Sequence, residues 1–215
     1  MKFFFFMIVA LLVFGCETEP FVFPDGNNYP SRTEPIPVNP NDTIIIDTTT
    51  YSVDYIGKIQ TWTSNDWDFW EVSLLDSSYG RYQTWTSEDW DHWEFYIDDI
   101  EGDIQTWTSE DWDYWELTAG DIYYSIRAWT SNDFDYWEIE SDDIYLAART
   151  WISEDWDFWE IYNDSVYYKI RTWSSEDWDY WEVYADTNYV RLKDLAAACF
   201  IPIFTSSIYI QGVMQ

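Results

Sequence analysis

Six short stretches of this sequence carry carboxylates at one fixed spacing, Asp-x-Asp-x-x-Glu. Oxygen ligands clustered at a turn are what Ca²⁺ prefers, and one ion takes about 6–8 of them. A single stretch supplies two or three, so neighbouring stretches or waters would have to complete the shell. Two interpretations stay open: a calcium site, and a solvated acidic turn that keeps sheets from aggregating edge to edge. The candidate ligands are Asp89, Asp91, Asp111, Asp113, Asp155 and Asp157.

The same carboxylates could be the acid pair of a glycoside hydrolase, in which two carboxyl groups flank the scissile bond. Repetition argues against this, because catalysis needs one asymmetric pair with separated pKa values, and six equivalent stretches give six similar environments. The only histidine, His92, stands where other copies have Phe or Tyr, so it is most simply a substituted face residue. The sequence also lacks a nucleophile motif and a glycine-rich phosphate loop. We therefore expect that the protein is not an enzyme.

All 17 tryptophans lie in these six stretches, three in each copy except the one where Phe134 replaces an indole. Aromatic rings flanked by carboxylates suit the apolar faces and hydroxyls of a polysaccharide, and a row of them would hold a long chain multivalently. The row could equally bind a protein, or the indoles could be structural, since each can bury about 150–250 Å². The candidate binding residues are the first tryptophans of the copies, Trp62, Trp85, Trp107, Trp129, Trp151 and Trp173.

A further alternative rests on the Thr-x-Thr pairs that begin with Thr61, Thr84 and Thr106. Such pairs resemble the threonine ladders of ice-binding proteins. The pattern fails in later copies, at Ala128 and Ile152, so the resemblance carries little weight.

The stretches belong to a tandem array from about residue 51 to residue 195. Their first tryptophans are separated by 23 residues once and by 22 residues four times. Between the stretches, apolar and polar side chains alternate with β-branched and aromatic enrichment, which indicates strands. Placing a two-residue turn at Ala119-Gly120 sets Trp115 opposite Tyr124 and gives both one face. The equivalent register in two other copies predicts a β-hairpin for each repeat, with a longer turn at Ser-Glu-Asp.

Six hairpins make an antiparallel meander of about twelve strands, and the predicted fold is all-β. The third tryptophans and the second-strand Ile, Val and Tyr should share one face, while Glu116, Arg127 and Trp129 lie on the other. The meander could stay open, close into a barrel or fold into two layers, because open sheets beyond about ten strands usually curl or split. A β-solenoid with one repeat per coil is the alternative. An outer-membrane barrel is disfavoured, since its strands need about 9–11 residues.

The charge of the chain limits its partners. The formal net charge is −31, so the phosphate backbone of a nucleic acid would be repelled. Acidic chains with few aromatic residues are often disordered, but 22% of this chain is aromatic, which predicts a folded domain.

The N-terminus has the form of an export signal. Lys2 precedes an apolar run of about a dozen residues, too short to span a bilayer as a helix. The run ends in Val13-Phe14-Gly15-Cys16, which resembles the lipobox of bacterial lipoproteins. The resemblance implies cleavage before Cys16 and its acylation, so a membrane anchor. Glu17 and Glu19 resemble the export signal of surface-exposed Gram-negative lipoproteins, which implies an outer-membrane, cell-surface location.

The regions outside the array have their own composition. Residues 1–15 are the signal, and residues 16–50 hold six of the seven prolines and are predicted to be a tether, in which Thr43–Ile46 is the one run with strand character. Residues 188–195 align with the repeat as a degenerate copy, and residues 196–215 form a non-repeat cap or tail. For that tail, a capping strand or strand pair is favoured over a membrane helix. The sequence therefore predicts a lipid-anchored surface protein whose repeats bind a ligand without catalysis, or alternatively serve as an envelope scaffold.

Overall fold

The computed structural model describes residues 43–46 and 49–214. The predicted signal, Cys16 and most of the predicted tether lie outside the described residues. Strand β1 (Thr43–Ile46) pairs with β2 (Thr49–Ser52) in a separate two-stranded sheet, so the run with strand character is a strand but adds nothing to the repeat sheet.

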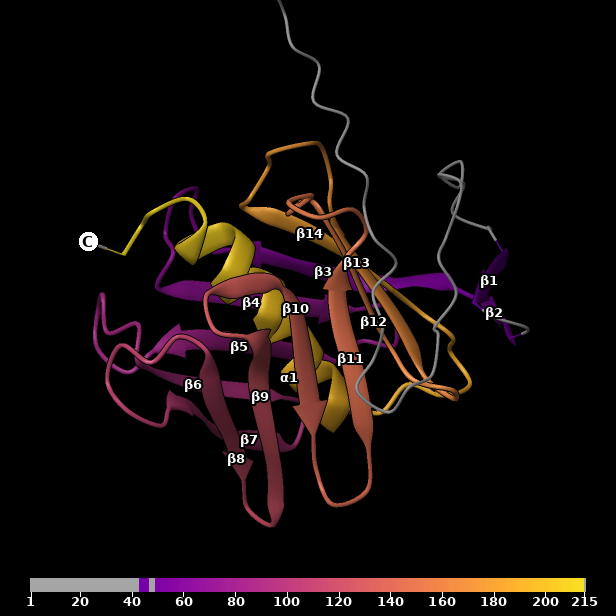
Figure 1. Ribbon diagram of the computed structural model, residues 1–215, viewed down its shortest axis with the longest axis horizontal. Coiled ribbons are helices and arrows are strands. Elements are labelled where there is room, and N and C mark those ends of the chain that lie inside the picture. The colour runs from indigo at the N-terminus through magenta and orange to yellow at the C-terminus, as the bar shows by residue number, and fades with distance from the viewer. Residues whose placement is uncertain (1–42, 47–48, 215) are drawn as a thin grey trace, which may run out of the picture. The chain divides into compact units, whose positions relative to one another are not determined.

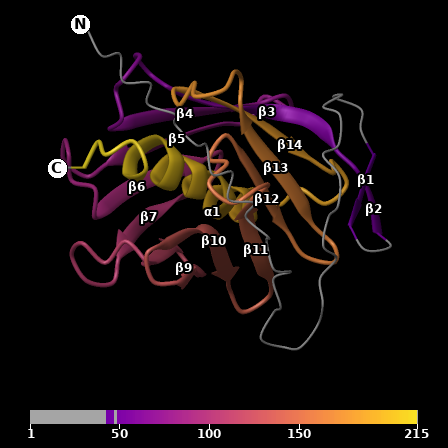
Figure 2. The same cartoon turned by 45° about the horizontal axis from the view of Figure 1, so that its top comes forward.

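Twelve antiparallel strands form one closed barrel in chain order, because β14 pairs with β3 (Figures 1 and 2). This confirms the all-β meander of hairpins and decides its closure. The strands are β3 (Asp54–Thr61), β4 (Phe69–Leu74), β5 (Tyr79–Thr84), β6 (His92–Ile97), β7 (Ile100–Thr106), β8 (Tyr114–Ala119), β9 (Ile122–Thr130), β10 (Asp133–Glu140), β11 (Tyr145–Thr150), β12 (Phe158–Tyr162), β13 (Tyr167–Thr172) and β14 (Tyr180–Ala185).

The predicted hairpin register is wrong, because each two-residue turn lies one residue later in the chain than predicted. Trp115 lies opposite Ile126 rather than Tyr124, and the turn residues are Gly120 and Asp121, with Gly120 in the left-handed region at φ 60°. In the fifth copy, the Asn163 side chain accepts hydrogen bonds from the backbone of Ser165 and Val166, so Asn163 precedes the turn rather than forming it. The face assignment survives, because the shift moves each partner by two residues and side chains alternate with period two.

The barrel wall has a dry inner face and a polar outer face. The six third tryptophans all point inward and are at most 1% exposed. Glu116, Arg127 and Trp129 point outward, as predicted, and the Arg127 guanidinium pairs with Glu138 on the adjoining strand at 2.6 Å. The buried indoles are Trp70, Trp93, Trp115, Trp137, Trp159 and Trp181.

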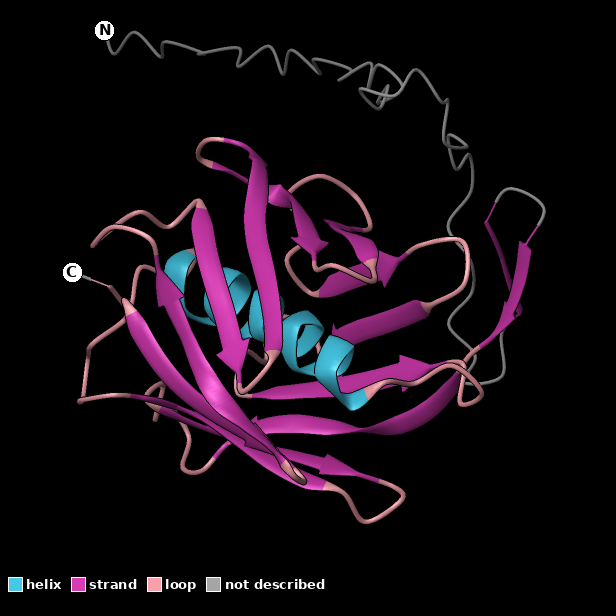
Figure 3. Cartoon of the chain, turned by 90° about the horizontal axis from the view of Figure 1, so that it is seen from below, coloured by secondary structure: helices cyan, strands magenta, loops and turns pink. Residues whose placement is uncertain are grey.

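The C-terminal residues form a helix inside the barrel, and the prediction of a capping strand is wrong. The α-helix α1 (Leu192–Pro202) continues as a π-helical segment, η1 (Ile203–Tyr209). Every residue from Asp194 to Ile208 is buried, and Figure 3 shows the helix enclosed by strands. The wider helical pattern begins directly after Pro202, which has no N–H to donate. The last residues of the aligned segment 188–195 form the first turn of this helix rather than a strand.

The helix fills a barrel that would otherwise be hollow. Eight strands already close around a space that side chains fill, and the diameter grows with strand number. Here the Phe200 ring lies 5.0 Å from Trp115 and 5.8 Å from Trp93, and the Trp159 Nε1 donates to Ser206 Oγ at 2.8 Å. The segment Leu192–Tyr209 is long and apolar enough to cross a membrane by composition, but 83% of it is buried in the barrel.

Buried polar groups hold the first turn of the helix. The Asp194 carboxylate is fully buried, pairs with Arg191 at 2.7 Å and accepts a hydrogen bond from the Tyr124 hydroxyl. The Tyr82 hydroxyl donates to the carbonyl oxygen of Ala196 at 2.7 Å. These contacts fix the depth at which the helix enters the barrel.

Candidate binding surface

The first tryptophans lie where the odd-numbered strands end. The Trp85 N–H donates to the carbonyl oxygen of His92 at 2.9 Å, and Trp62 is bonded to Phe69 in the same way at 3.2 Å. Each indole therefore faces the ring of the residue seven positions on, because cross-strand partners share a face. Ring centroids in the six pairs are 4.7 to 6.1 Å apart. Five pairs meet edge to face, whereas Trp85 and His92 stack with their planes 2° apart.

The predicted row of indoles is bent into a ring by closure of the barrel. Because β14 pairs with β3, Trp173 of the last repeat is the neighbour of Trp62 of the first. Trp129 and Trp151 are half-buried, while the other four indoles are between 57% and 69% exposed. These four are consecutive around the ring, and we call them the exposed arc: Trp173, Trp62, Trp85 and Trp107.

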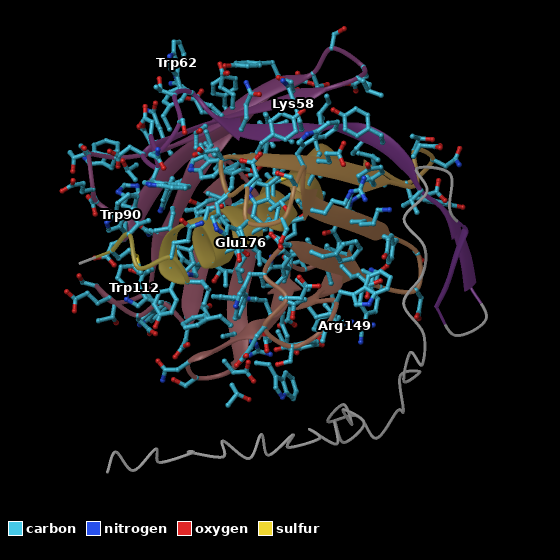
Figure 4. All side chains as sticks on the ribbon, turned by 90° about the horizontal axis from the view of Figure 1, so that it is seen from above. Lys58, Trp62, Trp90, Trp112, Arg149 and Glu176 are labelled. Carbon is cyan, nitrogen blue, oxygen red and sulfur yellow. The ribbon has the colours of Figure 1, made fainter. Side chains whose placement is uncertain are left out.

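The second aromatic residue of each repeat seals the same end of the barrel from the inside. Trp112 packs on Phe204 with centroids 5.7 Å apart, and Phe134 packs on Tyr209 at 4.3 Å. Figure 4 shows Trp90 and Trp112 near the end of the helix and Trp62 pointing away from it. Neighbouring indoles in one repeat thus have opposite surroundings, one toward the helix and one toward solvent.

The second aspartate of each repeat binds the next hairpin. The Asp91 carboxylate accepts hydrogen bonds from the Thr106 hydroxyl at 3.2 Å, the Ser109 hydroxyl at 2.6 Å and the Glu110 N–H at 2.8 Å. We call this arrangement the carboxylate clasp. The serine and N–H bonds of the clasp occur in all six repeats, and the threonine bond in five, because Ala128 replaces the threonine that would reach Asp113. The clasp aspartates are Asp68, Asp91, Asp113, Asp135, Asp157 and Asp179.

The last clasp closes the ring. Asp179 accepts hydrogen bonds from Ser64 Oγ at 2.7 Å and from the Asn65 N–H at 3.0 Å, across 114 to 115 residues of sequence. The sequence places serine and aspartate in a turn and predicts bonds within it, but the serine binds the neighbouring hairpin. The sequence does contain a signal for closure of the ring. The first repeat has serine and N–H donors but no preceding clasp aspartate, and the last repeat has a clasp aspartate but no following donors.

The clasps give half of the proposed calcium ligands another role. Asp91, Asp113 and Asp157 hold the hydroxyl and N–H donors of the next hairpin. Asp89, Asp111 and Asp155 begin the return half of each long turn, and their carbonyl oxygens accept the N–H three residues on. Burial, followed by the charge of Asp157, raises the pKa of Asp155. Within residues 53–214, no three side chains of the types that bind metals converge. Calcium binding stays one of the two alternatives for these turns, beside a solvated acidic turn.

The third acidic residue of each repeat lies in a hydrogen-bonded belt on the outer wall. Tyr79 donates to Glu71 at 2.7 Å, and Tyr123 donates to Glu116 at 2.8 Å. Burial and the Glu182 carboxylate together raise the pKa of Tyr184 to about 12. Five of these carboxylates accept hydrogen bonds from phenol or guanidinium groups, and Glu94 accepts one from the Gln83 amide.

His92 is the only histidine of the sequence and stands where the other repeats have Phe or Tyr. Its ring stacks on Trp85, and its Nε2 lies 3.0 Å from the Asp103 carboxylate. Both contacts are those of an aromatic face residue.

Neither a family model nor a curated protein nor a solved structure matches this chain. The candidate surface therefore rests on its own geometry.

Proposed function

We propose that this chain is a lipid-anchored binding module of the cell envelope, without catalytic activity, and that the ring of first tryptophans binds polysaccharide. One observation carries the proposal: Trp107 is 69% exposed, while Trp115 of the same repeat is fully buried. Folding explains a buried indole, because burial of apolar surface stabilises the protein. It does not explain four adjacent indoles held in water by a rigid wall, and contiguous exposed apolar groups mark interaction sites.

The geometry also supports binding outside the barrel rather than within it. The helix and the inward indoles occupy the interior, so the surface offered to a ligand is the rim and the outer wall. Indole faces suit the apolar faces of sugar rings, and adjacent carboxylates accept hydrogen bonds from sugar hydroxyls. Four adjacent exposed indoles on a rigid scaffold favour a repeating ligand, because a second contact is made at high effective concentration.

A glycan array on the purified full chain tests this proposal. The variant Trp85→Ala/Trp107→Ala should keep the fold and lose glycan binding. The matched control, Tyr79→Ala/Tyr123→Ala, removes two exposed aromatic side chains from the opposite end and should bind normally. Normal binding by the tryptophan variant would refute the ring as the binding surface.

The anchor has a separate test. Because Val13–Cys16 resembles a lipobox, cells that express the wild-type protein should incorporate labelled fatty acid into it. The Cys16→Ser variant should remain unlabelled. An unlabelled, soluble wild type would end the proposal of a lipid-anchored protein at the cell surface.

The second candidate function is a structural or protein-binding scaffold of the envelope. The carboxylate clasps favour it, because they lock all six hairpins into a closed ring. A folded wild type that binds no glycan but captures one envelope protein through the exposed arc would favour this alternative.

A further inference from the structure

The long turns at the end of the barrel that carries the exposed arc contain charges of one sign only. Its six long turns are residues 62–68, 85–91, 107–113, 129–135, 151–157 and 173–179, and we call them the long-turn rim. Every one of these turns contains two or three carboxylates, and none contains Lys or Arg. The basic side chains among residues 53–214 lie on strands or at the start of the helix. An anionic ligand approaching the rim would therefore be repelled.

The carboxylates of the rim fall into two groups. The clasp aspartates are occupied by donors of the next hairpin. At the tips of four turns a glutamate is exposed, and its backbone is held in the left-handed region, as at Glu88 and Glu110 with φ 62°. Each tip glutamate follows an indole of the ring by three residues in the same turn. Three turns of the exposed arc, those of Trp173, Trp85 and Trp107, therefore combine an indole with a solvent-facing negative charge, whereas the tip of the Trp62 turn is the neutral Asn65.

We propose that the exposed arc recognises a glycan with free amino groups, a polymer of unacylated amino sugars. This inference rests on the proposed function and narrows its ligand class. The apolar face of a sugar ring would lie on an indole, and its ammonium group would meet the tip glutamate and the π-face of the same indole. An ammonium within about 6 Å of an indole centroid is attracted by the ring quadrupole.

The regular spacing of the indoles favours a polymer as the ligand. Equivalent positions on every second strand are about 9.6 Å apart along a sheet, so neighbouring indoles present the same group at regular intervals. A polymer with one amine per sugar can satisfy several sites in succession, whereas a folded basic protein has no such period. The curvature of the barrel limits contact to adjacent members of the arc. Trp85 and Trp107 are adjacent members that each have a tip glutamate, whereas the turn of Trp62 has Asn65 at that position.

The test uses titration calorimetry of the full chain with hexasaccharides of one backbone. The ligands are the glucosamine hexamer, its N-acetylated form, the glucose hexamer and a uronate hexamer. The amino hexamer should bind at least about tenfold more tightly than the other three. Its affinity should fall as salt rises from about 0.05 to 0.5 M, because exposed charges are screened.

Two variants separate charge from stacking. Glu88→Gln/Glu110→Gln should weaken binding of the amino hexamer by about tenfold or more and leave any binding of the neutral hexamer unchanged. The control Asp121→Asn/Asp142→Asn removes two exposed charges from the opposite end, and it should behave as wild type. An equal effect of both variants would overturn the inference, because it would indicate net charge alone.

The other outcomes are also informative. Equal affinity for the glucose and glucosamine hexamers would overturn the amino-sugar inference and leave the tryptophan-dependent function standing. Equal affinity for a lysine hexapeptide would overturn it in favour of any polycation. Loss of all binding in Trp85→Ala/Trp107→Ala, together with the amine preference, would support both proposals, and binding that ignores this variant would refute both.

Discussion

The three aromatic positions of each repeat carry one type of side chain in three environments. The third indole is buried in the wall, the second packs on the helix, and the first faces solvent. Trp115→Ala should lose about 3–5 kcal/mol of unfolding free energy, because it opens a cavity beside Phe200 and Phe204. Trp107→Ala should lose about 1 kcal/mol or less, the value of one edge contact. Urea unfolding measures both, and equal losses would contradict an exposed ring.

The fourth repeat has an incomplete clasp that a single substitution should repair. Asp113 accepts bonds from Ser131 and from the Asn132 N–H, but Ala128 stands where other repeats supply a threonine hydroxyl. Ala128→Thr should add a hydrogen bond to Asp113 and raise the unfolding free energy by about 0.5–1.5 kcal/mol. The control Ala128→Val has the same shape and β-branching without the hydroxyl. Equal stabilisation by both variants would assign the gain to strand propensity and not to the clasp.

Alternation made the faces of the strands predictable, and it could not reveal the clasps. Trp115 and Leu117 are two residues apart on one strand, so the pleat gives them a common face whichever register the strand adopts. The partners of Asp91 lie 15 to 19 residues away on another hairpin. The alternation along a single strand carries no information on such contacts. The exposure of Trp107 and the hydrogen bonds of Asp91 therefore follow only from the three-dimensional structure.

At the scale of elements, the helix is the part that sequence reasoning missed. A helix buried on all sides has no polar face, so residues 194–208 show no amphipathic period and resemble a buried strand. Ser206 and Ser207 favoured the strand interpretation, but they are hydroxyl partners for Trp159 and Trp181. The run Ala196–Ala198 was the available signal, because alanine has the highest helix propensity.

The helix carries a natural probe of its own release. Cys199 is fully buried at its centre, and burial raises the pKa of the thiol well above its usual range. In a Cys16→Ser protein, where it is the only thiol, Cys199 should react with iodoacetamide only as fast as the whole protein unfolds. The rate of Cys199 alkylation, measured at rising urea concentrations, tests this, and the alkylation rate of the unfolded chain is the reference. Fast labelling of the native protein would mean that the helix leaves the barrel without unfolding of the wall.

For the whole molecule, the net charge of −31 opposes compaction. Cations should therefore raise the melting temperature by screening. Because the clasp carboxylates already bind donors, Ca²⁺ and Mg²⁺ should have equal effects at the same ionic strength. Calorimetry at matched ionic strength decides this, since preferential binding to the native state adds stability beyond screening. A larger shift with Ca²⁺ would establish a specific metal site.

The number of repeats sets the fit between the wall and the helix. Every clasp is local to two hairpins, so the clasps alone would allow rings of other sizes. Barrel diameter grows about linearly with strand number, so ten strands would close to a diameter about one-sixth smaller. A helix with its side chains is about 10–12 Å across, and the indoles around it already lie in contact with its phenylalanines.

Deleting residues 151–172 should therefore destroy the fold although it preserves every local contact. The deletion joins Thr150 to Trp173, the Thr-Trp junction of other copies, and Asp135 would meet Ser175 in place of Ser153. The shorter protein should label at Cys199 without denaturant, because the narrower ring cannot admit the helix. In the control, a copy of residues 107–127 replaces residues 151–171, which keeps twelve strands, an inward indole and an inward tyrosine, and Cys199 should stay protected. A protected thiol in the ten-strand protein would show that a narrower barrel still admits the helix. The diameter of the helix would then not set the number of strands.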